Sequence, residues 1–302
     1  MTTSSPRPLP AVEPPAYERD FEGVAARTGG VDGSESVVLD DIEARPGSTT
    51  SLLRTLIGLY LRPLGGRISS AALVRLAGDL GVPAARTRTA MTRLKQRGLL
   101  IATADAAYAL NPDALPMLER GDRRIFAVRT MAAGEEWMLV SATIPETRRD
   151  LRHQLRRRLQ FLGAGAVSAG LWILPGHLAE EVEQLLAELD ARAYATLFRT
   201  TDPKPADSLP VAAARWWDLA ALRAEHERFQ ASLGDLDETE PFAAYVRLID
   251  SWRVLPYVDP GLPASLLPPD WPGERSVREF GRLSSALAPP ALAHVRGAVG
   301  RS

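Results

Sequence analysis

The feature that most constrains the fold is the change of apolar spacing between residues 48 and 110. Apolar residues first recur every three or four positions, which predicts three helices, over 49–61, over 70–80 and from Pro83 onward. Gly81 and Val82 separate the second helix from the third as a tight turn, and two short β-like runs follow at 99–103 and 107–110. Helix, helix, turn, helix and hairpin is the element order of a winged helix-turn-helix.

The third of these helices carries a pattern that is typical of DNA recognition. If Thr87, Ala90, Met91 and Leu94 face inward, the opposite face is rich in arginine and threonine and free of acid. Arginine pairs with guanine, glutamine with adenine, and threonine can bond a base edge or touch a thymine methyl. The alternative is an ordinary polar surface helix. The residues expected to contact DNA are Arg86, Arg88, Thr89, Thr92, Arg93 and Gln96.

The charge of the chain is concentrated in the same segment. The net charge is only -1, yet residues 49–128 hold 12 Lys and Arg against 5 Asp and Glu. Such a basic segment is expected of a domain that binds a polyanion, although a solvated basic surface would look the same. Residues 1–48 hold 4 Arg against 9 acids and are rich in Pro, Gly and Ser, which predicts a disordered tail.

Two further regions follow, and together they predict an α+β protein. Residues 129–205 read as strand, helix, two strands, helix and strand, which is the βαββαβ order of a ferredoxin-like domain. Residues 206–302 predict an all-helical domain with helices over 214–232, 241–254 and 273–287 and an extended, Pro-rich connector at 255–273. The expected domains are therefore a tail (1–48), a winged helix (49–128), a ferredoxin-like domain (129–205) and a C-terminal helical domain for effector binding and dimerisation (206–302).

Composition excludes several classes of site. The chain has no cysteine, so it has no disulfides and no thiolate chemistry, and none of its 4 histidines is spaced with another as a zinc pair requires. We expect no metal, no cofactor and no enzymatic activity. No apolar run is long enough to cross a bilayer and no signal peptide is recognisable, so we expect a cytoplasmic protein without a membrane partner.

A second group of candidate residues could bind a small effector. The predicted helix over 146–162 places several arginines at i,i+4 spacing, which favours either a solvated face or a phosphate site. The C-terminal region is rich in tryptophan, which favours core packing or an apolar pocket with a few polar anchors. The candidate effector residues are Arg152, Arg156, Trp216, Arg247, Trp252 and Arg253.

Several motifs in the same order resemble the PaaX family of transcriptional repressors, which regulate phenylacetate degradation. They are ARTRTAMTRLKQRGLL (85–100), WMLVSATIPETRRDLRHQLRRRLQFLGAGAVSAGLWILP (137–175), RWWDLAAL (215–222) and WRVLPYVDPGLPASLLPPDWPG (252–273). The resemblance implies a homodimeric repressor that binds a palindromic operator on double-stranded DNA. It also implies release by an aryl-CoA thioester such as phenylacetyl-CoA. The acid-bearing hairpin around Asp105 and the long tail depart from the family pattern.

Two other functions compete with this interpretation. The middle domain is similar to a small CRISPR-associated nuclease subunit, which would predict a metal-dependent nuclease. The position of the metal-binding aspartate of those nucleases corresponds to Thr143 here, which opposes a metal site. The third possibility is a DNA-binding scaffold whose C-terminal domain recruits a protein.

Overall fold

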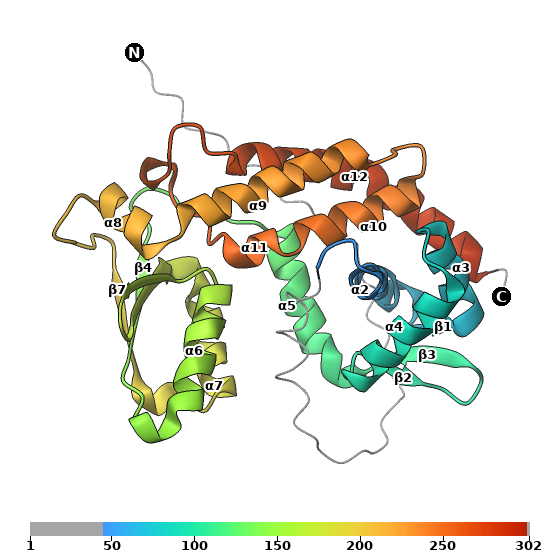
Figure 1. Ribbon diagram of the computed structural model, residues 1–302, viewed down its shortest axis with the longest axis horizontal. Helices are drawn as coiled ribbons and strands as arrows, with labels where there is room; N and C mark the ends of the chain where they lie inside the picture. Colours follow the sequence, from blue (N-terminus) through green and yellow to red (C-terminus); the bar gives the residue numbers. More distant parts are fainter. Residues whose placement is uncertain (1–44, 301–302) are drawn as a thin grey trace. The chain divides into compact units, whose positions relative to one another are not determined.

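The computed structural model describes residues 45–300, which form two compact units (Figure 1). Unit 1 combines the residues up to 127 with 232–253 and 278–300, and unit 2 combines 128–231 with 254–277. Helices and two small antiparallel sheets make the chain α+β, as predicted. The predicted tail lies outside the described residues except for 45–48. The C-terminal residues contribute to both units, and the division into three consecutive domains stays a prediction.

Unit 1 contains the predicted series of helices and a three-stranded sheet of order β1-β3-β2. Both neighbouring strand pairs of this sheet are antiparallel. Its elements are α2 (Thr49–Tyr60), β1 (Arg67–Ser69), α3 (Ser70–Asp79), α4 (Ala84–Gln96), β2 (Leu100–Ala102), β3 (Ala107–Leu110), α5 (Leu115–Phe126), α10 (Pro241–Trp252) and the greater part of α12 (Gly273–Val299).

Local capping and apolar packing explain the first helices of unit 1. The Ser48 hydroxyl accepts a hydrogen bond from the Ser51 amide at the start of α2 (3.3 Å). The Ser69 hydroxyl does the same for Ala72 in α3 (3.1 Å). The fully buried side chains that hold these helices together are Leu53, Leu56, Ile57, Leu73, Leu76, Met91 and Leu94.

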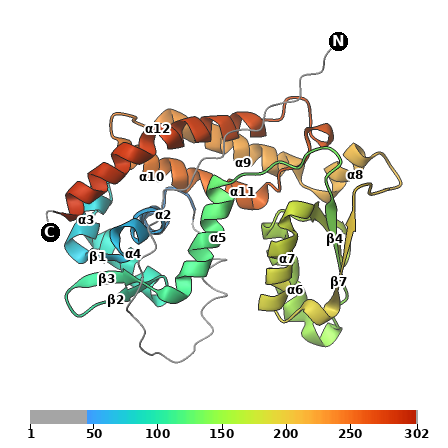
Figure 2. The ribbon, with the colours of Figure 1, turned by 180° about the vertical axis from the view of Figure 1, so that it is seen from behind.

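Helices α10 and α12 lie alongside each other in both views of the ribbon (Figures 1 and 2). The Trp252 ring stacks on Phe280 with centroids 4.4 Å apart. The prediction that the last helix ends at Leu287 is wrong, because α12 continues through Pro289 and Pro290 to Val299. Beyond the prolines its apolar face stays buried at Ala291, Val295 and Ala298, so packing outweighs the hydrogen bonds that proline removes.

Unit 2 is built around a four-stranded sheet of order β5-β6-β4-β7, in which every neighbouring pair is antiparallel. Its elements are β4 (Trp137–Ala142), α6 (Arg149–Phe161), β5 (Gly165–Ser168), β6 (Leu171–Pro175), α7 (Ala179–Glu188), β7 (Ala195–Thr200), α8 (Leu209–Trp216), α9 (Leu219–Ser232) and α11 (Leu255–Val258), with the first turn of α12.

Both faces of the central strand β4 are covered, which explains its apolar character. Met138 and Val140 belong to one core, which contains the buried faces of α6 and α7. Trp137 belongs to a second core with Trp217 and residues of the Pro-rich connector. Because successive side chains of a strand point to opposite faces, a strand that is covered on both sides is apolar throughout.

The structure differs from the predicted elements at four other places. Helix α5 was not predicted. The predicted helix over 146–162 begins as a 3-10 turn (Glu146–Arg148) before α6, and the one over 214–232 is two helices with a break at Trp217–Asp218. The connector is not entirely extended, because it contains α11 and a 3-10 turn at Ala264–Leu266. No helix that we can describe combines the length and apolar character needed to cross a membrane.

Candidate nucleic-acid interface

Helix α4 begins and ends through backbone features that are encoded locally. Pro83 occupies the cap position in an extended conformation, and its carbonyl accepts from the Thr87 amide (3.0 Å). At the other end Gly98 has φ of +76°, and the Leu99 amide bonds back to the Leu94 carbonyl (3.0 Å). Between these ends lie 13 residues, none of them acidic.

The predicted inward face of α4 is confirmed. Thr87, Ala90, Met91 and Leu94 are its buried residues. All the candidate DNA-contacting residues lie on the exposed side: Arg86, Arg88, Thr89, Thr92, Arg93 and Gln96. The structure thus brings this predicted set together on one surface of one helix, and contact of that surface with DNA remains a prediction.

The polar groups of this face differ in whether they already have hydrogen-bond partners within the protein. Within residues 45–300, the guanidinium groups of Arg86, Arg88 and Arg93 have no hydrogen-bond or ion-pair partner. The Thr89 hydroxyl donates to the Ala85 carbonyl and the Thr92 hydroxyl to the Arg88 carbonyl, both at 3.1 Å. Each threonine therefore offers a methyl group and acceptor lone pairs to a ligand, whereas the arginines keep all their donors.

The β2–β3 hairpin beside α4 carries little net charge. Asp105 forms an ion pair with Arg67 of β1 and accepts a hydrogen bond from the Thr103 hydroxyl (2.6 Å). The hairpin spans residues 100–110 without a lysine or arginine, and Ile101 on β2 is 45% exposed. The acid that departs from the family pattern is therefore neutralised by a neighbour.

Three arginines of the basic segment outside α4 have partners inside unit 1. Arg54 is 5% exposed and donates to the Met117 sulfur, and Arg62 forms a two-point ion pair with Asp122 (2.6 and 3.0 Å). Their guanidinium groups are therefore unavailable. Arg75 donates to the Ala298 carbonyl (3.0 Å). These partners are distant in the sequence, so the sequence alone does not predict them.

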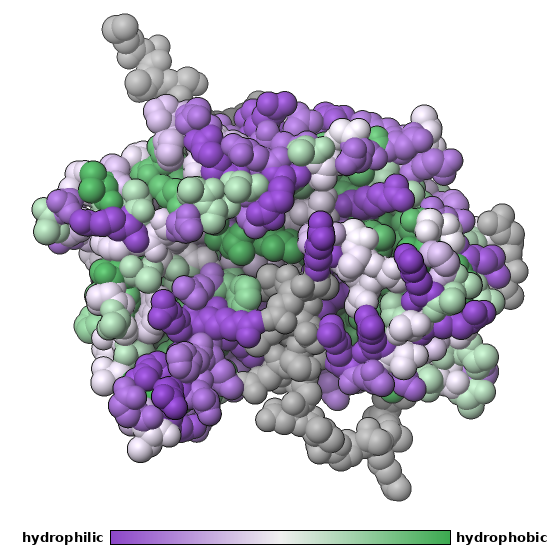
Figure 3. Space-filling view, in the orientation of Figure 1, coloured by the Kyte–Doolittle hydropathy of each residue, from purple (hydrophilic) through white to green (hydrophobic). Residues whose placement is uncertain are grey.

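The predicted effector residues of unit 2 lie on α6 and α8. Arg152 binds both carboxylate oxygens of Glu146 (2.5 and 3.2 Å), and this hydrogen-bonded contact lowers the pKa of Glu146 below its ordinary value. Arg156 is exposed on the same helix. In Figure 3 hydrophilic side chains gather at the lower left, over the part of unit 2 that holds α6 and α7. Trp216 is half-buried, with its ring at an edge-on angle to Trp217 (centroids 6.1 Å apart).

The other three predicted effector residues belong to unit 1 and have internal contacts. Arg247 donates to the Leu80 carbonyl (3.1 Å). Trp252 is fully buried and donates from its indole nitrogen to the Ile125 carbonyl (3.0 Å). Arg253, 6% exposed, contacts Asp250 (3.3 Å) and the Ser51 hydroxyl (2.8 Å). Six predicted residues are thus divided between two units, and their role in effector binding stays a prediction.

A buried His–Asp pair joins α9 to the Pro-rich connector. His226 is 1% exposed, and its Nε2 lies 2.7 Å from an Asp259 carboxylate oxygen. The other Asp259 oxygen accepts from the Gly261 amide (2.8 Å), and Gly261 has φ of +72° with the Arg129 carbonyl against the position of a Cβ. The Asp-Pro-Gly sequence at 259–261 is thus explained by a turn that only glycine fits.

Residues 45–300 contain no group of three or more His, Asp or Glu side chains that could hold a metal ion. Thr143, the position that would carry the metal-binding aspartate of a nuclease, is exposed, and its amide donates to the Tyr194 carbonyl (3.0 Å).

Three family models match consecutive parts of the chain. The model described as PaaX-like protein matches residues 48–113, the PaaX protein central Cas2-like domain matches 131–212, and the PaaX-like protein C-terminal domain matches 217–297. The chain belongs to the PaaX family.

Individual proteins agree with this membership. The Escherichia coli (strain K12) protein named transcriptional repressor PaaX is 27% identical over 270 residues, which are 84% of this chain and 85% of that protein. The solved structure of the uncharacterized protein Rv0674 from Mycobacterium tuberculosis has a TM-score of 0.58 and 25% identity. That match covers 82% of this chain and all of the other.

The PaaX models follow the elements of the fold. The first model spans α2 to β3 and so includes α4 with all six candidate DNA contacts. The central Cas2-like model spans the sheet of unit 2, and the C-terminal model spans α9 to α12. The exposed arginine face of α4 therefore lies within a segment that the PaaX family shares.

Proposed function

We propose that this PaaX-family chain is a DNA-binding transcriptional repressor in which α4 reads the major groove. The observation that carries the proposal is the outward face of α4, where three arginines without an internal partner among the described residues stand beside two threonines and a glutamine. These side chains match the donor and acceptor groups of base edges. The name of the E. coli relative supports the role of repressor.

The arrangement that we propose around α4 is a winged helix-turn-helix. Helix α3, the turn at Leu80–Pro83 and α4 supply the helix-turn-helix, and β2 and β3 supply the wing. Since the Asp105–Arg67 pair neutralises the hairpin, we assign base reading to α4 and little phosphate contact to the wing.

For unit 2 we propose a ferredoxin-like domain in a homodimer that binds a palindromic operator. The strand order β5-β6-β4-β7, with α6 and α7 packed on one face of the sheet, supports the ferredoxin-like assignment. Two identical reading helices require two half-sites related by a dyad, which makes the operator palindromic. This function is non-enzymatic and belongs in the cytoplasm.

We further propose that an aryl-CoA thioester such as phenylacetyl-CoA releases the repressor from DNA. Arg156, which is exposed on α6, would meet its phosphate groups, and Arg152 would join it by exchanging Glu146 for a phosphate. Trp216 would contribute apolar surface. Release requires that the thioester bind more tightly to the form that does not bind DNA. We give Trp252 and Arg253 a structural role because both are buried among internal partners.

The test uses double-stranded DNA selected from a random pool by the wild-type protein. Fluorescence anisotropy then measures the affinity of Arg88→Ala and Arg93→Ala, each expected to weaken binding by about 1–3 kcal/mol. Arg282→Ala, which removes an exposed arginine of α12, is the control and should bind like the wild type. Unchanged affinity in both α4 variants would rule out α4 as the reading helix.

The effector is tested in the same assay. Phenylacetyl-CoA should raise the dissociation constant for DNA, whereas coenzyme A alone and phenylacetate alone should have little effect. A protein that binds the selected DNA equally with and without the thioester would favour the scaffold function over an effector-controlled repressor.

A further inference from the structure

Helix α10 is separated from α4 by about 150 residues of sequence, yet it belongs to the same compact unit. Most of α10 is apolar and buried, as expected of a core helix. Two of its polar residues, Asp250 and Arg247, reach elements that flank the proposed reading helix. They do so at different places, and both contacts are directional.

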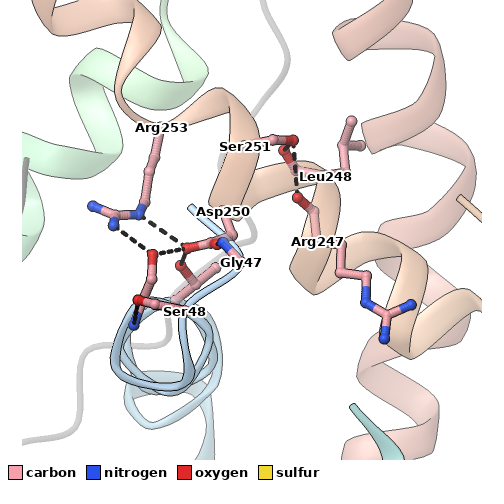
Figure 4. A network of polar contacts seen from close by, with 9 residues as sticks. Gly47, Ser48, Arg247, Leu248, Asp250, Ser251 and Arg253 are labelled. Carbon is pink, nitrogen blue, oxygen red and sulfur yellow. Dashed lines mark hydrogen bonds and ion pairs between the residues drawn. The ribbon is translucent and has the colours of Figure 1, made fainter. Parts of the chain in front are cut away.

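The first contact is a buried polar network around the Asp250 carboxylate, which is shown in Figure 4. One oxygen accepts from the Gly47 amide (2.6 Å), and the other accepts from the Thr55 hydroxyl (3.0 Å) and from Arg253 Nε (3.3 Å). The Ser51 hydroxyl also donates to Asp250 and in turn accepts from Arg253 Nη2 (2.8 Å). Asp250, Ser51, Thr55 and Arg253 are all buried, so the network fixes the first turns of α2 against the end of α10.

The second contact holds the turn that precedes α4. Arg247 Nη2 donates to the Leu80 carbonyl (3.1 Å), at the end of α3 and three residues before the cap of α4. Helix α12 adds two contacts to α3, from Arg75 to the Ala298 carbonyl (3.0 Å) and between His294 and Asp79 (2.8 Å). The C-terminal helices therefore hold α3 by its carboxyl end.

Both contacts act on α4 through direct neighbours. Helix α2 packs against α4 as well as against α10, and α3 leads directly into α4 through the turn that Arg247 holds. A buried ion pair contributes little to stability compared with an apolar replacement, but its geometry fixes how two elements meet. The network is thus better suited to setting an orientation than to holding the fold together.

We propose that α10 is the positioning strut of the reading helix, with Asp250 fixing α2 and Arg247 fixing the turn before α4. Asp250 and Arg247 are positioning residues, because they act on DNA recognition through α4 and not by touching DNA. The consequence is that these two side chains set how well the protein discriminates between DNA sequences. This consequence rests on the proposed DNA-binding function.

The first experiment needs no DNA. Amide hydrogen exchange is measured on the full chain for the wild type, Asp250→Asn and Arg247→Ala, with Ser251→Ala as the matched control. Ser251 is the neighbour of Asp250 on α10, and among residues 45–300 its hydroxyl bonds only within that helix. The amides of α2 should exchange about ten times faster in Asp250→Asn, and those of Leu80, Gly81 and Val82 about ten times faster in Arg247→Ala, with the control unchanged. Exchange that is unchanged in both variants would overturn the proposal.

The second experiment measures discrimination as the ratio of affinities for selected and unrelated DNA. Asp250→Asn and Arg247→Ala should lower this ratio about 10-fold, the size of one lost base contact, while unrelated DNA binds nearly as before. If Asp250→Asn fails to fold, Arg247→Ala, at an exposed position, carries the test alone. If the wild type shows no preference, the proposed function fails, whereas the exchange experiment still decides whether α10 is a strut.

A third variant separates positioning from stability. Ser51→Ala, Asp250→Leu and Arg253→Met together replace three of the four buried polar side chains of the network by apolar ones, which should restore the unfolding midpoint lost in Asp250→Asn. If α10 positions the reading helix, discrimination between DNA sequences should stay low in this triple variant although the fold is stable. Recovery of discrimination together with stability would mean that the network only stabilises the fold, and it would overturn the proposal.

Discussion

Helices α4 and α6 have the same length and are both rich in arginine, but they differ in whether acids pair with these arginines. Helix α4 has no acidic residue, and its outward arginines have no partner among the described residues. On α6 two of the arginines are paired with acids, Arg152 with Glu146 and Arg158 with Glu188 of α7 (2.8 Å). A basic helix is therefore suited to a polyanion only where the protein has not already satisfied its charge.

The largest expected effect is a loss of DNA affinity when arginines of α4 are removed. The double variant Arg88→Ala/Arg93→Ala should lose about 2–6 kcal/mol of binding free energy for its selected DNA, since each specific arginine contact contributes about 1–3 kcal/mol. Its unfolding free energy should stay within about 0.5 kcal/mol of the wild type, because both side chains are exposed and have no partner among residues 45–300. Anisotropy and urea unfolding measure the two quantities, and a large loss of stability would contradict the assignment.

The next effect, on α6, is a loss of stability without a loss of DNA affinity. Arg158→Ala removes a buried guanidinium (8% exposed) and its packing, which should lower the unfolding free energy by about 1–3 kcal/mol. Unit 2 carries no assigned DNA contact, so the affinity of the remaining folded protein for DNA should not change. A loss of DNA affinity at full stability would show that α6, too, contacts DNA.

Salt dependence sharpens the comparison further. Removing one phosphate contact lowers the slope of log affinity against log salt by about 1. Arg86→Ala, at the edge of the α4 face, should reduce the slope by about this amount, whereas Arg149→Ala on α6 should leave it unchanged. Equal slopes in the two variants would remove the distinction between the helices.

The smallest effect concerns pH. The hydrogen bond from Arg152 lowers the pKa of Glu146, so the pair stabilises the folded state at neutral pH and loses that contribution as the pH falls through the lowered pKa. Arg152→Ala should return the pKa of Glu146 towards its ordinary value, as followed by NMR titration of its carboxyl carbon. Because both side chains are exposed, thermal stability should hardly change. An unmoved pKa would show that the ion pair does not persist in solution.

The sequence predicted the inward face of α4 correctly because helical spacing is a local property. The same locality explains the errors. The proline pair at 289–290 is a strong stop signal, but the burial of Ala291, Val295 and Ala298 decides the length of α12. Helix α5 contains Pro116 and Gly121, which weaken its helical pattern.

Polar partners far apart in the sequence could not be predicted. Asp250 meets Ser51, 199 residues away, and a tryptophan or arginine near the C-terminus can equally well line a pocket or hold two helices together. Composition alone predicts that Trp252 and Arg253 bind the effector, and only the structure gives their internal partners. Residues committed to a ligand and residues committed to the fold share the same chemistry, so their environment has to be known.

The most direct test of the central claim is the base preference of Arg88→Ala. The wild type and the variant are each used to select binding sites from the same pool of random double-stranded DNA, and the enriched sequences are compared position by position. We predict that the wild type enriches an inverted repeat and that the variant loses the preference at one position of each half-site while keeping the rest. Identical enriched sequences from both proteins would contradict base reading by α4.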